Sequence, residues 1–403
     1  MVHYRYFLER RGFVRFFKSI LVIALIAAAA FFNRGAINDI IDSAEMPCEE
    51  KIYQALMEQR DTICLIGYDL EESELYDVWC DVAYSHADLF FVDDEYRYTM
   101  LGSRVLTVSP DYTLTAEALS SARQAYSTEM DKLRSLYDPQ WNDLETALFY
   151  HDYLCMCYSY DESLTRYSAY DMLTEGTGVC QSYALLYAEL LNGFGIECDY
   201  VISAEMNHAW NVVTIDGVKY NVDVTYDDPT SDRRGRASHQ YFLLSDKALS
   251  ADHSFTPAEG YGQCTDTRYD SGAVWQDVRT GFVPVENDFY FIKSGMLYRW
   301  DGGEPQYIDT IFATWFTGLG NDSYWKGNHS TLWFHEGLVL YSKPKSIMSY
   351  NPATGDFAYR YLFEGSEDIY GFSYIDNELV LQIGYSPNEP GRLVTASEGL
   401  RLP

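Results

Sequence analysis

The chain has 403 residues, of which 47% are hydrophobic and 22% charged, so it is long and apolar enough for two or three globular domains. Its formal net charge of −31 is unevenly distributed: residues 1–34 hold six Lys or Arg against one Glu, and the rest hold 23 basic against 59 acidic residues. A body this acidic repels phosphate backbones, which excludes nucleic acid as an expected partner.

The first 34 residues have the pattern of an export signal or a membrane anchor. Basic side chains precede an unbroken apolar run of 13 residues, Ile20–Phe32. As a helix this run spans about 20 Å, less than the ~30 Å hydrocarbon core of a bilayer. It is either a cleaved secretory signal or an uncleaved anchor that extends back past Arg15 and Lys18, whose side chains would snorkel. We favour the anchor; both interpretations place the acidic body outside the cytoplasm, in a single-pass membrane protein or a secreted one.

Eight cysteines in an exported chain raise the question of disulfides. None of them has CxxC spacing and no histidine cluster accompanies them, so no structural zinc site is expected. If one is a catalytic thiol, the other seven cannot all pair with each other. We therefore expect most of them to be small buried apolar residues, with a disulfide framework as the alternative.

Residues 35–135 are predicted to form an N-terminal region of mixed helix and strand. Apolar residues recur at helical spacing over 75–82 and 119–133, and residues 96–108 are predicted to be extended. A further helix is predicted to open at Asp138 and Pro139, a capping residue followed by a proline at the first helical position.

The residues most informative about chemistry are GTGVCQSYA, 176–184. Two glycines permit a tight backbone path just before Cys180, and apolar residues follow at helical spacing. Cys180 is therefore predicted to lie at a helix N-terminus, where unpaired N–H groups and the helix dipole lower the pKa of a thiol. The same N–H groups could help to stabilise an oxyanion. A buried structural cysteine is the alternative.

Two runs of alternating apolar and polar residues flank Asp216-Gly217, a strong signal for a two-residue hairpin turn. Such a turn opposes residues whose numbers sum to 433, so Trp210 faces Asp223. His208 and Asp223 then become diagonal neighbours on one face, close enough for the carboxylate to reach the imidazole. Trp210 would screen this pair from water. A thiolate, a base and an acid that orients the base are what nucleophilic cysteine catalysis requires.

These motifs resemble the transglutaminase-like superfamily, specifically its exported bacterial members. The resemblance covers about residues 138–250, in the segments GTGVCQSYA, HAWN (208–211), YNVDVTYDDP (220–229), FYHDYL (149–154), YSYD (158–161) and HQYFLLSD (239–246). It implies a papain-like α+β fold in which a nucleophile helix packs on an antiparallel sheet. It also implies that Cys180, His208 and Asp223 are the catalytic nucleophile, general acid–base and orienting acid.

The resemblance implies attack on an amide carbonyl through an acyl-thioester on Cys180, and it leaves the acyl acceptor open. Family members include peptidases, amidases and cross-linking transamidases. We expect a peptidase or amidase that acts on a peptide or protein at the cell surface; a protein-glutamine transamidase and a non-catalytic surface adaptor are the alternatives. Two residues depart from many bacterial relatives: Ser182 stands in place of a glycine and Tyr226 in place of a tryptophan.

Three residues near the triad are predicted to contact substrate or to support the catalytic groups: Gln181, Tyr183 and Trp210. No metal or cofactor is expected. The acidic run of Asp223, Asp227, Asp228 and Asp232 lacks the spacing of an EF-hand loop and is predicted to be a solvated loop. Packing or supporting roles behind the site are expected for His151, Asp152, His239 and Tyr241.

After about residue 265, short aromatic strands alternate with turn residues at a loose spacing of roughly 40–50 residues. Three such units are too few to close a propeller, so an open, stacked all-β unit is predicted, with a surface protein or a glycan as its possible partner. The predicted organisation is an apolar helix at 1–34, an α+β region at 35–135, a transglutaminase-like catalytic domain at 136–262 and a separate β-rich unit at 263–403.

Overall fold

The structure, a computed structural model, describes residues 46–228, 233–255, 263–315, 328–375, 378–386, 391–395 and 400–401. The chain divides into two compact units. The first ends at Leu133 and also includes Ser168–Tyr170, and the second contains most of the chain from Arg134 onward. The predicted apolar helix at 1–34 lies outside the described residues. Among the helices of the described ranges, none is both long and apolar enough to cross a bilayer.

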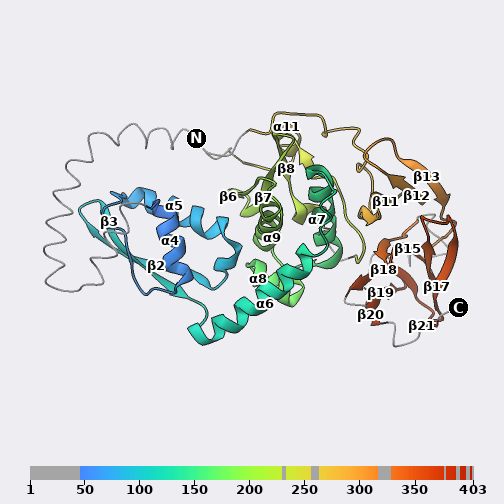
Figure 1. Cartoon of the computed structure of the whole chain (residues 1–403), viewed down its shortest axis with the longest axis horizontal. Coiled ribbons are helices and arrows are strands. Elements are labelled where there is room, and N and C mark those ends of the chain that lie inside the picture. The colour runs from blue at the N-terminus through green and yellow to red at the C-terminus, as the bar shows by residue number, and fades with distance from the viewer. Residues whose placement is uncertain are drawn as a thin grey trace. The chain divides into compact units, whose positions relative to one another are not determined.

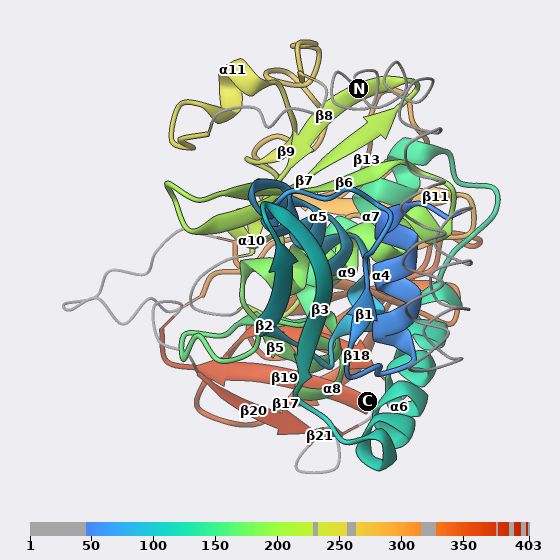
Figure 2. The ribbon, with the colours of Figure 1, turned by 90° about the vertical axis from the view of Figure 1, so that its left-hand side faces the viewer.

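The first unit packs helices against a small antiparallel sheet of order β1-β3-β2. The long hairpin of β2 and β3 turns at Gly102, where φ is 67°, and is conspicuous in Figure 2. The predicted apolar faces are confirmed: both helices bury side chains at the expected spacing within 75–82 and 119–133. The elements are α4 (Cys48–Met57), β1 (Ile63–Cys64), α5 (Glu72–Ser85), a 3₁₀ turn (Ala87–Leu89), β2 (Val92–Leu101), β3 (Arg104–Tyr112) and α6 (Ala116–Arg134).

The second unit is built on a four-stranded antiparallel sheet of order β6-β7-β8-β9, with α9 packed against β6 and β7 (Figure 1). The side-chain amide of Asn211 donates to the carbonyl of Ala184 at 2.9 Å, which fixes the helix to the central strand. This is the predicted helix-on-sheet arrangement. The elements are α7 (Asp143–Cys157), β4 (Ser159–Tyr160), α8 (Ala169–Glu175), β5 (Thr177–Gly178), α9 (Cys180–Gly193), β6 (Cys198–Ser203), β7 (His208–Ile215), β8 (Val218–Val222), α10 (Val224–Asp227), β9 (Phe242–Leu244) and α11 (Asp246–Leu249).

The β7–β8 hairpin has the predicted register. Its pairs run from Ile215 with Val218 to Asn211 with Val222. The turn residues adopt φ values of 51° and 76°, the left-handed geometry that Asp-Gly supplies at low cost. The predicted pair of Trp210 with Asp223 does not form, because Asp223 leaves the strand to cap α10, where its carboxylate accepts the N–H of Tyr226.

The predicted start of α7 is wrong by four residues. The helix begins at Asp143, after an Asn142 cap. The Asn142 side chain accepts the Glu145 N–H at 3.0 Å, and the Glu145 carboxylate accepts the Asn142 N–H at 2.9 Å. These reciprocal bonds satisfy two N–H groups that a start at Asp138 would leave to other partners, so this capping box sets the boundary.

In the described part of the C-terminal β region, the strands form three antiparallel sheets. Met156 of α7 lies in their shared hydrophobic core, and the Phe282 N–H donates to Asp152 Oδ2 at 2.6 Å. These strands therefore share a core with α7 inside one compact unit. The sheets contain β10 (Val283–Val285), β11 (Asp288–Lys293), β12 (Met296–Trp300) and β13 (Gln306–Thr310); β14 (Leu332–His335), β15 (Leu338–Lys343), β16 (Ser346–Tyr350), β17 (Phe357–Phe363) and β21 (Leu400–Arg401); and β18 (Asp368–Ile375), β19 (Glu378–Gly384) and β20 (Arg392–Thr395).

The hairpin turn provides a stability test. Gly217→Ala is expected to lower the free energy of unfolding by about 1 kcal/mol, because φ of 76° strains an L side chain while no atom lies within 4 Å to clash with it. Asp216→Asn is the matched control, since asparagine tolerates the left-handed region. Urea unfolding measures the stability of both variants. Equal losses of unfolding free energy would show that backbone strain at position 217 does not cause the effect of Gly217→Ala.

Candidate active site

Cys180 is the first residue of α9, as predicted, with Val179 as the cap. The backbone before it needs its glycines. Gly176 has φ of 75°, and a Cβ at Gly178 would lie 2.6 Å from the Cβ of Ser182. The tight path over these residues brings the thiol to the start of the helix, where unpaired N–H groups favour an anion.

The pKa of the Cys180 thiol is lowered despite partial burial. Burial by itself raises the pKa, but the His208 imidazole lowers it through a side-chain hydrogen bond and its charge. The backbone N–H groups of Ala209 and Gln181 add to this effect. Together they favour a thiolate paired with an imidazolium, which is the reactive form of a catalytic cysteine.

His208 begins β7 and is held by Asp223. Burial would lower the pKa of His208, but its bonds to Asp223 and Cys180 raise the pKa to about 9. His208 Nε2 donates to Asp223 Oδ2 at 2.6 Å, which leaves Nδ1 as the ring nitrogen available to the thiol. Asp223 is fully buried and hydrogen bonds hold its pKa below the usual range, so it is a carboxylate that accepts from His208. The structure thus brings Cys180, His208 and Asp223 together.

Residues 132–223, the segment that contains all three groups, match the family model of the transglutaminase-like superfamily. The chain carries a transglutaminase-like domain. Its helix-on-sheet core agrees with the expectation drawn from the motifs, and the catalytic roles expected for the three residues stay a prediction.

Three solved structures are similar to parts of this chain. The first is a candidate cysteine protease from Cytophaga hutchinsonii, with 17% identity and a TM-score of 0.21; the match covers 34% of this chain and 63% of that one. The second is a TGase, with 12% identity, a TM-score of 0.23 and coverage of 39% of this chain and 48% of that one. The third is the extracellular domain of a candidate one-component system of B. thetaiotaomicron, with 13% identity, a TM-score of 0.21 and coverage of 49% of this chain and 22% of that one. The chain spans less than two thirds of each. No curated protein matches it.

The three predicted neighbours of the triad lie in different environments. Gln181 is half-buried beside the thiol, and its backbone N–H forms a hydrogen bond to the sulfur. Trp210 is buried, stacks 6.1 Å from the His208 ring and donates to Asn221 at 3.1 Å. Tyr183 is fully buried and its hydroxyl donates to Asp228, so it supports the fold behind the helix.

One neighbour of the triad was not predicted. His253 is buried, and its Nε2 lies 2.9 Å from Asp223 Oδ2, the same oxygen that accepts from His208. Its Nδ1 lies 2.7 Å from Asp252. The contact joins residues 30 positions apart, and His253 follows α11 in neither a helix nor a strand, so no helical or strand periodicity indicates it.

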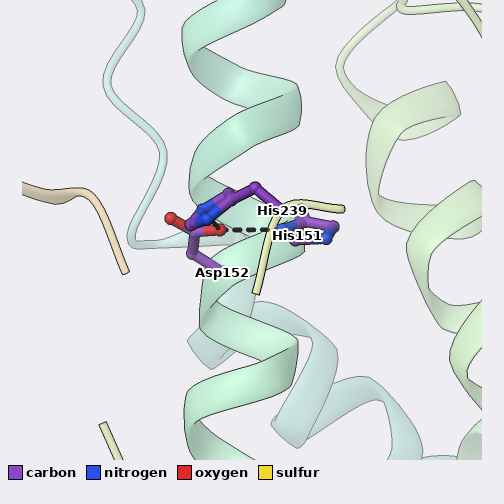
Figure 3. A group of neighbouring side chains, drawn as sticks. All are labelled: His151, Asp152 and His239. Carbon is purple, nitrogen blue, oxygen red and sulfur yellow. Dashed lines mark hydrogen bonds and ion pairs between the residues drawn. The ribbon is translucent and has the colours of Figure 1, made fainter. Parts of the chain in front are cut away.

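A second buried polar group lies on α7 and the segment before β9. It joins His151 and Asp152 of α7 to His239, with all three side chains inaccessible to solvent (Figure 3). Asp152 Oδ1 accepts from His151 Nδ1 at 2.7 Å and from His239 Nε2 at 2.9 Å. These bonds hold the three side chains to one another inside the domain, and their supporting role behind the site stays a prediction.

The predicted solvated acidic loop is wrong for the residues that the structure describes. Asp227 is fully buried, lies 3.2 Å from His151 Nε2 and accepts the N–H groups of Gln240 and Tyr241. Asp228 is also buried, against Tyr183. Isolated buried carboxylates are costly, but these carboxylates have hydrogen-bond donors, which sequence spacing did not reveal. Asp232 lies outside the described residues.

Among the residues that the structure describes, two clusters could supply metal ligands by proximity: His151, Asp152 and His239, and His208, Asp223 and His253. In each cluster the nitrogen and oxygen atoms face one another as hydrogen-bond partners. These bonds account for the clusters without an ion. The eight cysteines are free thiols in this structure; three are buried and five are half-buried, so the expectation that most of them are buried is wrong.

The buried network predicts a pH effect on stability. Burial lowers the pKa of His151, but its bonds to Asp152 and Asp227 raise it overall to about 9. Because this value exceeds that of an unfolded histidine, the stabilisation is complete below about pH 6.5 and is lost as the pH rises through 9.

The His151→Gln variant tests this effect. Its free energy of unfolding is expected to fall less than that of the wild type between pH 6.5 and 9, with a difference of up to about 3 kcal/mol. Both proteins keep His208, so its titration cancels. Parallel curves in urea unfolding at each pH would contradict the assignment.

Proposed function

We propose that this chain is an extracytoplasmic cysteine-dependent amide-bond enzyme, and that it hydrolyses peptide or amide bonds of a protein or peptide substrate at the cell surface. The observation that carries the proposal is the contact chain from the Cys180 thiol to His208 and from His208 Nε2 to the buried carboxylate of Asp223. The transglutaminase-like match over the same residues supports it.

The reaction would proceed through a thioester. The Cys180 thiolate attacks the amide carbonyl carbon and forms a C–S bond, while nearby N–H groups at the start of α9 face the developing oxyanion. The C–N bond then breaks as the His208 imidazolium gives its proton to the leaving amine. Water, deprotonated by neutral His208, cleaves the C–S bond and regenerates the thiolate.

The acyl acceptor and the location are the finer parts of this proposal. Water as acceptor rests on the resemblance to exported bacterial members, and a primary amine would instead give transamidation. The extracytoplasmic location rests on the basic and apolar residues 1–34 before an acidic body. Protease digestion of intact cells is expected to remove the body; protection until the membrane is opened would contradict the location.

Thiol reactivity is the direct test of the site. Iodoacetamide is expected to modify Cys180 below pH 7, at roughly 100 times the rate of an ordinary thiol, because a thiol with a pKa near 8.5 is about 1% ionised at pH 6.5. His208→Asn is expected to lose this advantage. Peptide mass spectrometry follows the rate, with Cys180→Ala as the background; reaction only above about pH 8 in the wild type would overturn the proposal.

Turnover separates the two acceptors. Amide substrates are expected to yield free acid, with the rate abolished by Cys180→Ala and lowered by about 10⁴ by Asp223→Asn, which disturbs the orientation and tautomer of His208. Added methylamine diverts the product to the methylamide if an amine is the preferred acceptor. Quantitative conversion to the methylamide at low amine concentration would show that the enzyme is a transamidase and would contradict hydrolysis as its reaction.

A further inference from the structure

His253 shares an acceptor atom with the general acid–base. Asp223 Oδ2 accepts from His208 Nε2 at 2.6 Å and from His253 Nε2 at 2.9 Å, while Asp223 Oδ1 accepts the Tyr226 N–H. The two imidazoles therefore compete for the negative charge on one oxygen. A carboxylate that divides its charge between two donors holds each proton less strongly than one with a single donor.

The position of His253 is fixed from several sides. Its backbone N–H donates to Leu249 at the end of α11, and the next residue is bonded to Ser203, whose hydroxyl donates to the Ser254 carbonyl at 2.6 Å. The ring lies edge-on to Trp210 at 5.6 Å. Its Nδ1 faces Asp252, which in turn accepts the Tyr241 hydroxyl at 2.6 Å.

We propose that His253 is a positioning residue that acts through Asp223: it limits how strongly the carboxylate, bonded to Nε2, stabilises the His208 imidazolium, so that His208 can release its Nδ1 proton to the leaving amine. The contacts form a continuous path from Asp252 through His253 and Asp223 to His208. This inference rests on the proposed function and extends it, since the transglutaminase-like triad ends at Asp223.

Several titratable groups surround the two imidazoles. Those that interact with His208 are Cys180, Asp223, Tyr226 and His253. Those that face His253 are Asp223, Asp252, Tyr226, Tyr241 and His208. Loss of the His253 donor leaves the Asp223 charge to His208 alone, so His208 keeps its proton to a higher pH.

Two amide substitutions separate this role from packing. In His253→Gln the amide nitrogen reaches the place of Nε2 and can still donate to Asp223. In His253→Asn it reaches only the place of Nδ1, toward Asp252. A role in packing predicts similar behaviour of the two variants, whereas donation to Asp223 predicts that only glutamine preserves the wild-type titration.

The experiment measures the rate of Cys180 alkylation by iodoacetamide against pH in the full chain. The rate rises once as the thiolate–imidazolium pair forms and again as His208 loses its proton and leaves a more nucleophilic thiolate. The second rise is expected to move up by roughly one pH unit in His253→Asn. It is expected to stay in place in His253→Gln and in His329→Asn, a control that removes another buried histidine, bonded to Arg236.

The outcomes distinguish the two proposals. A wild-type profile with a single rise above about pH 8 overturns the proposed function itself. A normal two-step wild-type profile that is unchanged in His253→Asn overturns only the role of His253, as does an equal shift in the glutamine variant or in the control. Thermal unfolding of each variant verifies that the compared proteins are folded; a shift in His253→Asn alone supports the inference.

Discussion

The buried carboxylate of Asp223 is the group on which the site depends most. It lies at the end of β8, caps α10 through the Tyr226 N–H and accepts from two imidazoles on a single oxygen. Burying such an ion is costly unless donors surround it, and here every donor comes from a different part of the fold. The orientation of His208, and through it the state of the Cys180 thiol, follows from this one arrangement.

Two sets of hydrogen bonds connect the segments around Asp223 to the rest of the domain. Asn211 joins α9, the helix that bears the thiol, to β7, the strand that bears His208, through a hydrogen bond to the Ala184 carbonyl. Asp227 binds the backbone of the segment whose Tyr241 carbonyl accepts the Asp223 N–H. The network of His151, Asp152 and His239 is therefore connected through Asp227 to the segment bonded to Asp223.

The C-terminal sheets are connected to this same support. Asp152 accepts the Phe282 N–H, and Met156, one turn further along α7, lies in the core of the β strands. α7 thus takes part in the buried polar network through Asp152 and in the core of the β strands through Met156. This connection links the β-rich region to the transglutaminase-like domain.

The sequence by itself determined the parts of the site that depend on local chemistry. Glycines before Cys180 and apolar spacing after it predicted the helix start, and Asp216-Gly217 predicted the β7–β8 register, because backbone conformation and strand periodicity are short-range properties. The α7 boundary was missed because a reciprocal side-chain cap at Asn142 outweighed the proline signal. Only the tertiary structure placed His253 on Asp223 and buried Asp227, because these contacts join segments 30 and 76 residues apart, where burial and the pairing of donors decide the partner.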